Sequence, residues 1–106
     1  MRVRWLAAAR ADVREIGRWI AKDRPDAAKD VARRIRRSAQ TLGQNPGLGR
    51  AGVVLDTRER VVTGLPYIII YRVRDVVEIV WVVDARRDWP ASFDLAARLG
   101  DDSAGH

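Results

Sequence analysis

Residues 43–52, GQNPGLGRAG, divide the chain into two parts whose apolar residues follow different spacings. Four glycines and a proline within these ten residues interrupt regular structure. Before the break, apolar residues recur every three or four positions, whereas after it β-branched and aromatic residues form short runs. The first spacing is typical of amphipathic helices and the second of strands. We therefore expect an α+β fold in which two helices come first and most of the sheet follows.

The helical part contains two amphipathic stretches, the first from Ala9 to Lys22 and the second from Pro25 to Leu42. Pro25 suits the first position of a helix, and Asp26 follows in the first turn, where a negative charge interacts favourably with the helix dipole. Because the connection is short, we expect the two helices to form an antiparallel hairpin. The outer faces of the hairpin carry basic rows at Arg10, Arg14, Arg18 and Lys22, and at Lys29, Arg33, Arg36 and Arg37.

Four stretches have the pattern of strands. Residues 2–6 alternate apolar and basic side chains and predict a short N-terminal edge strand. Residues 53–62, 66–73 and 76–84 are rich in β-branched and aromatic side chains, and their short connections predict an antiparallel meander. In the middle stretch, Tyr67, Ile69 and Tyr71 alternate with Ile68 and Ile70. One face of the sheet can be covered by the hairpin, and we expect the other to remain an apolar surface that a partner covers.

The length of 106 residues allows one domain, which we place at residues 1–92. Residues 93–106 form a tail whose spacing predicts a short helix followed by a disordered end. The sequence contains no apolar run long enough for a membrane span or a secretory signal. We therefore expect a cytoplasmic protein that does not bind membranes. The chain has no cysteine, and its single histidine is the terminal His106. These absences exclude disulfides and thiolate nucleophiles, and we expect neither a metal nor a cofactor.

The net charge of +6 favours acidic partners, such as phosphate backbones or carboxylate-rich proteins. Arginines outnumber lysines 18 to 2, and coding bias accounts for this excess as well as a binding surface does. The basic rows of the two helices lack interleaved aromatic residues and a recognisable reading element. Direct readout of a nucleic-acid sequence by these rows is therefore not expected.

Five short motifs occur in an order and spacing that resemble the RelE/ParE superfamily of bacterial toxins, and within it the ParE branch. The resemblance covers roughly residues 3–90. The motifs are Gly49–Arg50, Thr57–Arg58–Glu59, Pro66–Tyr67, Tyr71–Arg72–Val73 and Ala85–Arg86–Arg87–Asp88–Trp89–Pro90.

This resemblance implies a toxin of a type II toxin–antitoxin system, of the kind that stabilises plasmids and arrests growth. The partner that it implies is a cognate antitoxin, which wraps a partly disordered segment around the toxin. Operator DNA would be contacted only indirectly, through the antitoxin. In the ParE branch the target is DNA gyrase, whereas in the RelE branch it is messenger RNA cut on the ribosome.

The chain departs from the nuclease branch at several positions. Ile68 follows Tyr67 where that branch tends to carry an arginine, and residues 85–90 offer no counterpart to its further tyrosine. Asp84 stands where many relatives carry histidine, and an aspartate with an ordinary pKa of about 3.9 is a weak proton donor at neutral pH. The resemblance therefore favours gyrase inhibition by binding over an enzyme. If the chain is instead an mRNA endonuclease, we expect Arg58, Tyr71 and Arg86 to serve it; a non-toxic relative is a third hypothesis.

Candidate binding residues divide into two groups. For the target we expect Arg58, Arg86 and Arg87, since Arg86 matches the most persistent basic position of the superfamily. For the antitoxin we expect Trp5, Ile68, Ile70 and Trp81. Trp5, Trp19 and Trp81 are interpreted as core or antitoxin-groove residues. Glu59 is interpreted as one half of a salt bridge that fixes the sheet against the hairpin, in preference to a general base.

Overall fold

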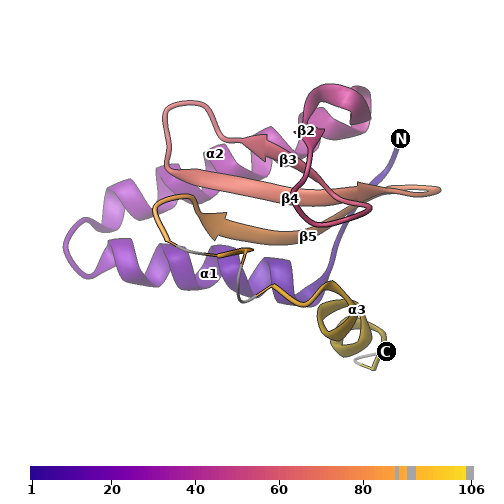
Figure 1. Cartoon of the computed structure of the whole chain (residues 1–106). Helices are drawn as coiled ribbons and strands as arrows, with labels where there is room; N and C mark the ends of the chain where they lie inside the picture. Colours follow the sequence, from indigo (N-terminus) through magenta and orange to yellow (C-terminus); the bar gives the residue numbers. More distant parts are fainter. Residues whose placement is uncertain (88, 91–92, 105–106) are drawn as a thin grey trace.

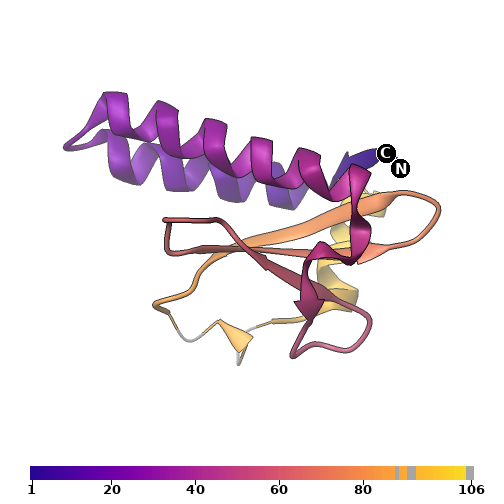
Figure 2. The same ribbon diagram turned by 90° about the horizontal axis from the view of Figure 1, so that it is seen from above.

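The computed structural model of the chain describes residues 1–87, 89–90 and 93–104, and its helices and strands form two layers (Figure 1). Helices α1 and α2 run side by side as one layer, and the sheet forms the other (Figure 2). The expected α+β fold with a helix hairpin is confirmed. In chain order the elements are β1 (Val3–Trp5), α1 (Ala7–Ala21), α2 (Pro25–Gln44), the 3₁₀ helix η1 (Pro46–Leu48), β2 (Arg50–Ala51), β3 (Arg58–Val61), β4 (Tyr67–Val73), β5 (Val77–Asp84) and α3 (Leu95–Ala104).

The sheet has the strand order β1-β5-β4-β3-β2. Strands β3, β4 and β5 form the expected antiparallel meander. Strand β1 adds to β5 in parallel, with Val3 opposite Val77 and Trp5 opposite Ile79. The sheet is therefore mixed, because β1 runs parallel to β5 while the neighbouring pairs from β2 to β5 are antiparallel. Alternation in residues 2–6 predicted an edge strand but not its partner or direction.

The core lies between the sheet and the hairpin. Helix α2 buries Ala28, Ile35, Ala39 and Leu42, which share one face as the spacing predicted. Ile35, Ala39 and Leu42 pack with the inward side chains of the sheet, among which Tyr67, Ile69 and Tyr71 are at most 5% exposed. Truncating a fully buried core residue such as Ile35 to alanine costs about 2–5 kcal/mol of stability.

The opposite face of the sheet is covered, so the expectation of an open apolar surface there is wrong. Ile68, Ile70 and Val83 form a second buried cluster, and Ile70 is 0% exposed. Trp81, Trp89 and Phe93 pack against this cluster, and the rings of Trp81 and Phe93 stack with centroids 4.3 Å apart. The chain after β5 folds back over this face and continues into α3 (Figure 1). Three large aromatic side chains thus cover the face that was expected to stay open.

The strand expected to begin at residue 53 begins at Arg58 instead. Residues 53–56 form an exposed turn in which Leu55 is 84% exposed and Asp56 adopts a φ of 68°. Two hydrogen bonds fix the turn, because the Thr57 amide and hydroxyl both donate to the Val54 carbonyl, at 3.2 and 2.6 Å. Local bonding by a threonine side chain competes here with the strand propensity of Val53 and Val54.

The predicted C-terminal helix is present as α3, and Phe93, Leu95 and Leu99 pack against the main core. The end of the predicted disordered tail, residues 105–106, lies outside the described residues. In the part of the chain that the structure describes, no helix combines the length and apolar character needed to cross a membrane.

Candidate functional site

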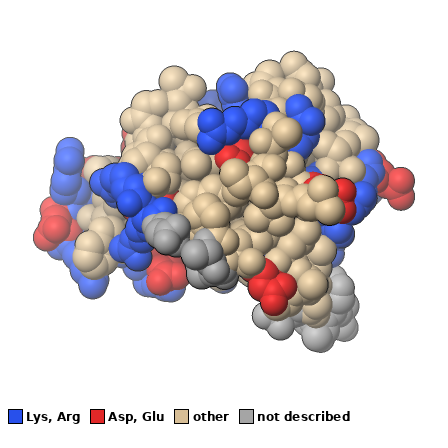
Figure 3. Space-filling model, viewed as in Figure 1, with Lys and Arg blue, Asp and Glu red and all other residues tan. Residues whose placement is uncertain are grey.

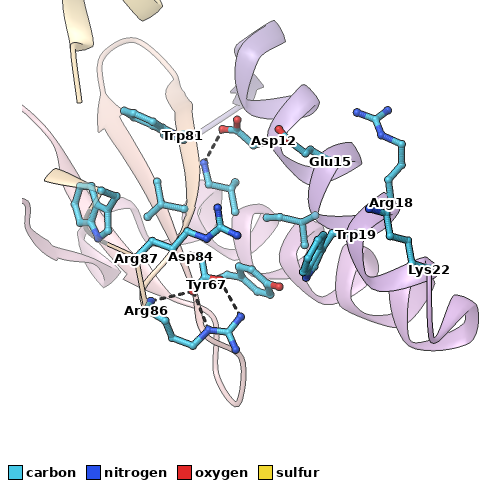
Figure 4. A pocket seen from close by; sticks show the side chains of 14 residues that line it. Asp12, Glu15, Arg18, Trp19, Lys22, Tyr67, Trp81, Asp84, Arg86 and Arg87 are labelled. Atoms are coloured by element: carbon cyan, nitrogen blue, oxygen red, sulfur yellow. Dashed lines mark hydrogen bonds and ion pairs between the residues drawn. The ribbon is translucent and has the colours of Figure 1, made fainter. Parts of the chain in front are cut away.

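A groove of about 950 Å³ lies between α1 and the end of β5 (Figure 4). Four consecutive residues of β5, Trp81 to Asp84, line it. Successive side chains of a strand point to opposite faces of its sheet, so a groove that contacts all four lies along the edge of the strand. The other lining residues are Asp12, Glu15, Ile16, Arg18, Trp19, Lys22, Tyr67, Arg86, Arg87 and Trp89.

At one end of the groove Arg86 folds back onto Asp84, and Figure 4 shows the contacts between them. The guanidinium donates to both carboxylate oxygens of Asp84, at 3.0 and 2.8 Å, and the Arg86 amide donates to one of them at 2.9 Å. These bonds hold the pKa of the Asp84 carboxyl below its ordinary value. Asp84 is therefore a charged partner of Arg86 at neutral pH and cannot act as a proton donor.

The remaining side chains at this end are exposed cations and aromatic rings. Arg87 is exposed, and it has no salt-bridge partner among the residues that the structure describes. Across the groove, Trp19 of α1 is 64% exposed, with the Lys22 ammonium 5.0 Å from its ring centroid. Trp19 lines the groove and is exposed, so its interpretation as a core residue is wrong, while its contact with an antitoxin stays a prediction. Figure 3 shows that basic side chains gather at this end of the molecule, around the α1–α2 turn.

At the other end of the groove, Asp12 and Arg98 form an ion pair with two bonds of 2.8 Å. Asp12 also accepts the Val82 amide at 3.0 Å, and Arg98 donates to the Val80 carbonyl at 3.2 Å. The Arg98 guanidinium lies 4.3 Å from the Trp81 ring centroid. Burial raises the pKa of the Asp12 carboxyl, while the bonds from Arg98 and Val82 oppose that shift.

The three residues expected to serve a nuclease are not brought together. Tyr71 is 0% exposed, and its hydroxyl donates to the Pro46 carbonyl at 2.7 Å and accepts the Gly49 amide at 2.8 Å. Arg58, opposite Tyr71 in the sheet, donates to the Gly47 and Gly49 carbonyls. These two side chains therefore anchor η1 and the residues that follow it.

Arg86 follows the far end of β5, where Asp84 is opposite Tyr67. Tyr67 and Tyr71 are four residues apart on β4, which corresponds to about 13 Å along the strand. Arg86 is thus separated from Arg58 and Tyr71 by most of the length of the sheet. No single phosphate can contact all three.

Glu59 forms the predicted salt bridge, but with a different element. It is 3% exposed, and it accepts Arg50 at 3.0 Å and the Val53 amide at 2.9 Å. Arg50 lies directly opposite Glu59 in the β2–β3 pair. The pair therefore ties β2 and the following turn to the sheet, and the expectation that it fixes the sheet against the hairpin is wrong.

The residues expected to meet the antitoxin lie in three different places. Trp5 is half-buried against the main core, and Trp81 lines the groove. Ile68 and Ile70 lie beneath Trp81, Trp89 and Phe93, where a partner reaches them only by displacing that cover. Sequence reasoning missed Asp12 and Arg98. The one signal was a carboxylate at Asp12, three residues after Ala9 and four before Ile16, on the otherwise apolar face of α1.

Comparisons with known proteins agree with the fold. A family model described as "ParE toxin of type II toxin-antitoxin system, parDE" matches residues 3–89. The protein named "Putative toxin Y4kP" from Sinorhizobium fredii is 44% identical over 89 residues, which cover 84% of this chain and 93% of that protein. A solved structure titled "Chromosomal ParDE TA system from P. aeruginosa" superposes with a TM-score of 0.73 at 23% identity. It covers 79% of this chain and 95% of the other, and it shares the fold.

Proposed function

The chain belongs to the ParE toxin family of type II toxin–antitoxin systems, and on that basis we propose that it arrests bacterial growth by binding DNA gyrase. A cognate antitoxin neutralises it by occupying the groove between α1 and β5. Toxin, antitoxin and gyrase meet in the cytoplasm, and operator DNA is reached only through the antitoxin. The action is binding and involves no cofactor.

The observation that carries the proposal is the separation of Tyr71 and Arg58 from Arg86. Cleavage of RNA requires groups that activate a hydroxyl and stabilise a charged phosphate at one place. Here the Tyr71 hydroxyl is occupied by two buried hydrogen bonds, and Arg58 binds backbone carbonyls. Both side chains have structural partners, which supports a binding protein over a nuclease.

The proposed target-binding residues are Arg86 and Arg87. Both are exposed at the end of β5, and the Arg86 guanidinium is already oriented by Asp84. Arginine binds carboxylates in a planar, two-bond geometry, so an acidic surface of gyrase is the partner that this end fits. Arg58, which was also expected to contact the target, lies beside Tyr71 and is not part of this surface.

A supercoiling assay with purified gyrase tests the proposal. We expect the wild-type chain to inhibit gyrase, the antitoxin to restore its activity, and the Arg86→Ala/Arg87→Ala double variant to inhibit at least tenfold less. The matched control is Arg2→Ala/Arg74→Ala, which removes the same charge from exposed positions near the opposite end of β5.

Two results would contradict the proposal. If the chain cuts messenger RNA at defined codon positions on the ribosome while gyrase is unaffected, it is an endonuclease of the RelE kind. If expression without the antitoxin leaves growth unchanged while the chain is folded, it is a non-toxic relative.

A further inference from the structure

Another hollow lies between α1 and α2, the two helices that run side by side in Figure 2. Its volume is about 450 Å³, and we call it the interhelical groove. None of its lining residues also lines the groove between α1 and β5, so the two are separate surfaces. The residues that line it are Val13, Arg14, Gly17, Ala28, Lys29, Ala32, Arg33 and Arg36.

Four of these eight lining residues are exposed cations. Lys29, Arg33 and Arg36 follow one another along α2 over about 10 Å of the helix axis. Arg14 lies across from them on α1. Among the described residues that line the groove, none is acidic, and the others are small or nearly buried. A ligand in the interhelical groove therefore meets positive charge from both helices.

The toxin itself does not neutralise these four cations. In the part of the chain that the structure describes, none of them takes part in a salt bridge. Asp30 follows Lys29 in the chain, but its carboxylate lies 3.9 Å from Arg34 instead. Residues 7–44, which form the hairpin, contain ten basic and five acidic residues, so most of the net charge of +6 lies there. The field on this side of the molecule attracts anions.

The lining suits a polyanion better than a protein partner. Protein interfaces depend on large aromatic or apolar anchors at their centre. Here the largest apolar side chain is Val13, which is only 3% exposed. Cations clustered along a helix are the usual electrostatic footprint of a nucleic-acid contact, and phosphate contacts need no group that reads bases. Charge is thus what the interhelical groove offers to a ligand.

We propose that the interhelical groove binds the phosphodiester backbone of duplex DNA. One strand of a duplex carries a negative charge about every 3.4 Å of its axis, so the row on α2 spans about three phosphates. Arginine donates two parallel hydrogen bonds to a phosphate, and lysine contributes a point charge. Such binding is independent of sequence, so recognition of the operator stays with the antitoxin.

The DNA concerned is the duplex on which gyrase acts. In the proposed function, Arg86 and Arg87 bind gyrase from one side of α1, while the interhelical groove lies on the other side. Once the toxin is bound to gyrase, a second and weak contact with the DNA becomes effectively intramolecular and strengthens the complex. This gain rests on the proposed function, whereas DNA binding by the free toxin does not.

Fluorescence anisotropy of a labelled duplex, titrated with the purified chain between about 50 and 200 mM salt, tests the site. The variant is Arg33→Gln/Arg36→Gln, because glutamine keeps the helix-forming tendency of arginine and removes its charge. The matched control is Arg2→Gln/Arg74→Gln, which removes the same charge from exposed positions outside the groove. Circular dichroism verifies that both variants are folded.

We expect the groove variant to bind the duplex at least about tenfold more weakly than wild type at about 0.1 M salt. The slope of log K against log salt should become shallower by about 1.8, since about 0.9 is lost with each phosphate contact. The control should leave this slope unchanged. Duplexes of unrelated sequence should bind the wild-type chain equally, because backbone contacts carry no sequence information.

A second measurement uses gyrase itself. In the supercoiling assay, we expect the concentration of the groove variant needed for half-inhibition to rise about threefold or more over wild type. Its affinity for gyrase without DNA should be unchanged. If that affinity falls instead, the groove binds an acidic surface of the protein and the assignment to DNA is wrong.

The remaining outcomes separate the inference from the function. If the wild-type chain does not bind duplex DNA at low salt, or if the folded groove variant binds it as tightly as the control, the DNA site is wrong while gyrase inhibition stands. If the DNA measurements agree with the expectation but the chain does not inhibit gyrase, the proposed function fails and the DNA site stands.

Discussion

The Tyr71 hydroxyl joins β4 to η1, and its removal gives a clean test of that role. Tyr71→Phe deletes one oxygen from a side chain that is 0% exposed. The oxygen donates to the Pro46 carbonyl and accepts the buried Gly49 amide. The substitution therefore leaves two backbone groups without their partner, and it opens almost no space.

The cost of this substitution follows from those two groups. A buried donor left unsatisfied costs about 1–3 kcal/mol, and a lost hydrogen bond to a group that water can reach costs about 1 kcal/mol. The Gly49 amide belongs to the first class and the Pro46 carbonyl, on a half-buried residue, to the second. We expect Tyr71→Phe to lower the free energy of unfolding by about 3 kcal/mol. With a slope of about 1.5 kcal/mol per molar urea, the midpoint falls by about 2 M.

Tyr67→Phe is the matched control for this measurement. Tyr67 lies on the same strand and the same face, yet its hydroxyl has no hydrogen-bond partner within the described part of the chain. We expect its removal to change stability by less than about 0.5 kcal/mol. Urea titration followed by tryptophan fluorescence measures both variants. If the two substitutions have equal effects, the anchoring role of Tyr71 is refuted.

Three further predictions concern glycines and the end of β5. Gly49→Ala places a Cβ 2.6 Å from the Tyr71 hydroxyl and 2.8 Å from a backbone carbonyl. Thermal unfolding should therefore show that the free energy of unfolding falls by about 1–3 kcal/mol. An unchanged unfolding midpoint would contradict this crowding. Gly17→Ala adds a Cβ in the interior of α1 that has nothing within 4 Å. It should raise the free energy of unfolding by about 0.5–1 kcal/mol in the same assay. A decrease would contradict this prediction. In Arg86→Ala, the pKa of Asp84 should rise toward its ordinary value in a carboxyl NMR titration, because the guanidinium that lowers it is gone. In the wild-type chain, the ion pair of Asp84 and Arg86 therefore stabilises the fold above the unfolded pKa of Asp84. This stabilisation is lost as the pH falls through the lower pKa that Asp84 has in the folded state.

The sequence predicts those parts of the fold that repeated spacing controls. The helix hairpin follows from the apolar face shared by Ala28, Ile35 and Leu42, and the faces of β4 follow from strict alternation. Both depend on residues close together in the chain. The strand content of residues 53–57 was overestimated, because β-branched residues indicate strands even where a threonine side chain fixes a turn.

Long-range contacts of single side chains could not be predicted in this way. Asp12 and Arg98 are separated by 86 residues, and nothing periodic connects them. The anchoring of η1 by Tyr71, the cover that Trp89 and Phe93 provide, and the parallel pairing of β1 likewise depend on how distant segments meet. The sequence therefore offers Arg86, Arg87 and Trp81 as candidates but not the groove that brings them together, which only the structure shows.

A growth assay of two folded variants tests the central claim most directly. The claim is that toxicity resides in the exposed end of the groove and not at a buried tyrosine. Each variant is expressed without antitoxin in a bacterial host, at a temperature where purified protein is folded. Tyr71→Phe should still arrest growth, because its hydroxyl only supports the fold, whereas Arg86→Ala/Arg87→Ala should not. If Tyr71→Phe abolishes arrest while the double arginine variant retains it, the account of how this toxin acts is contradicted.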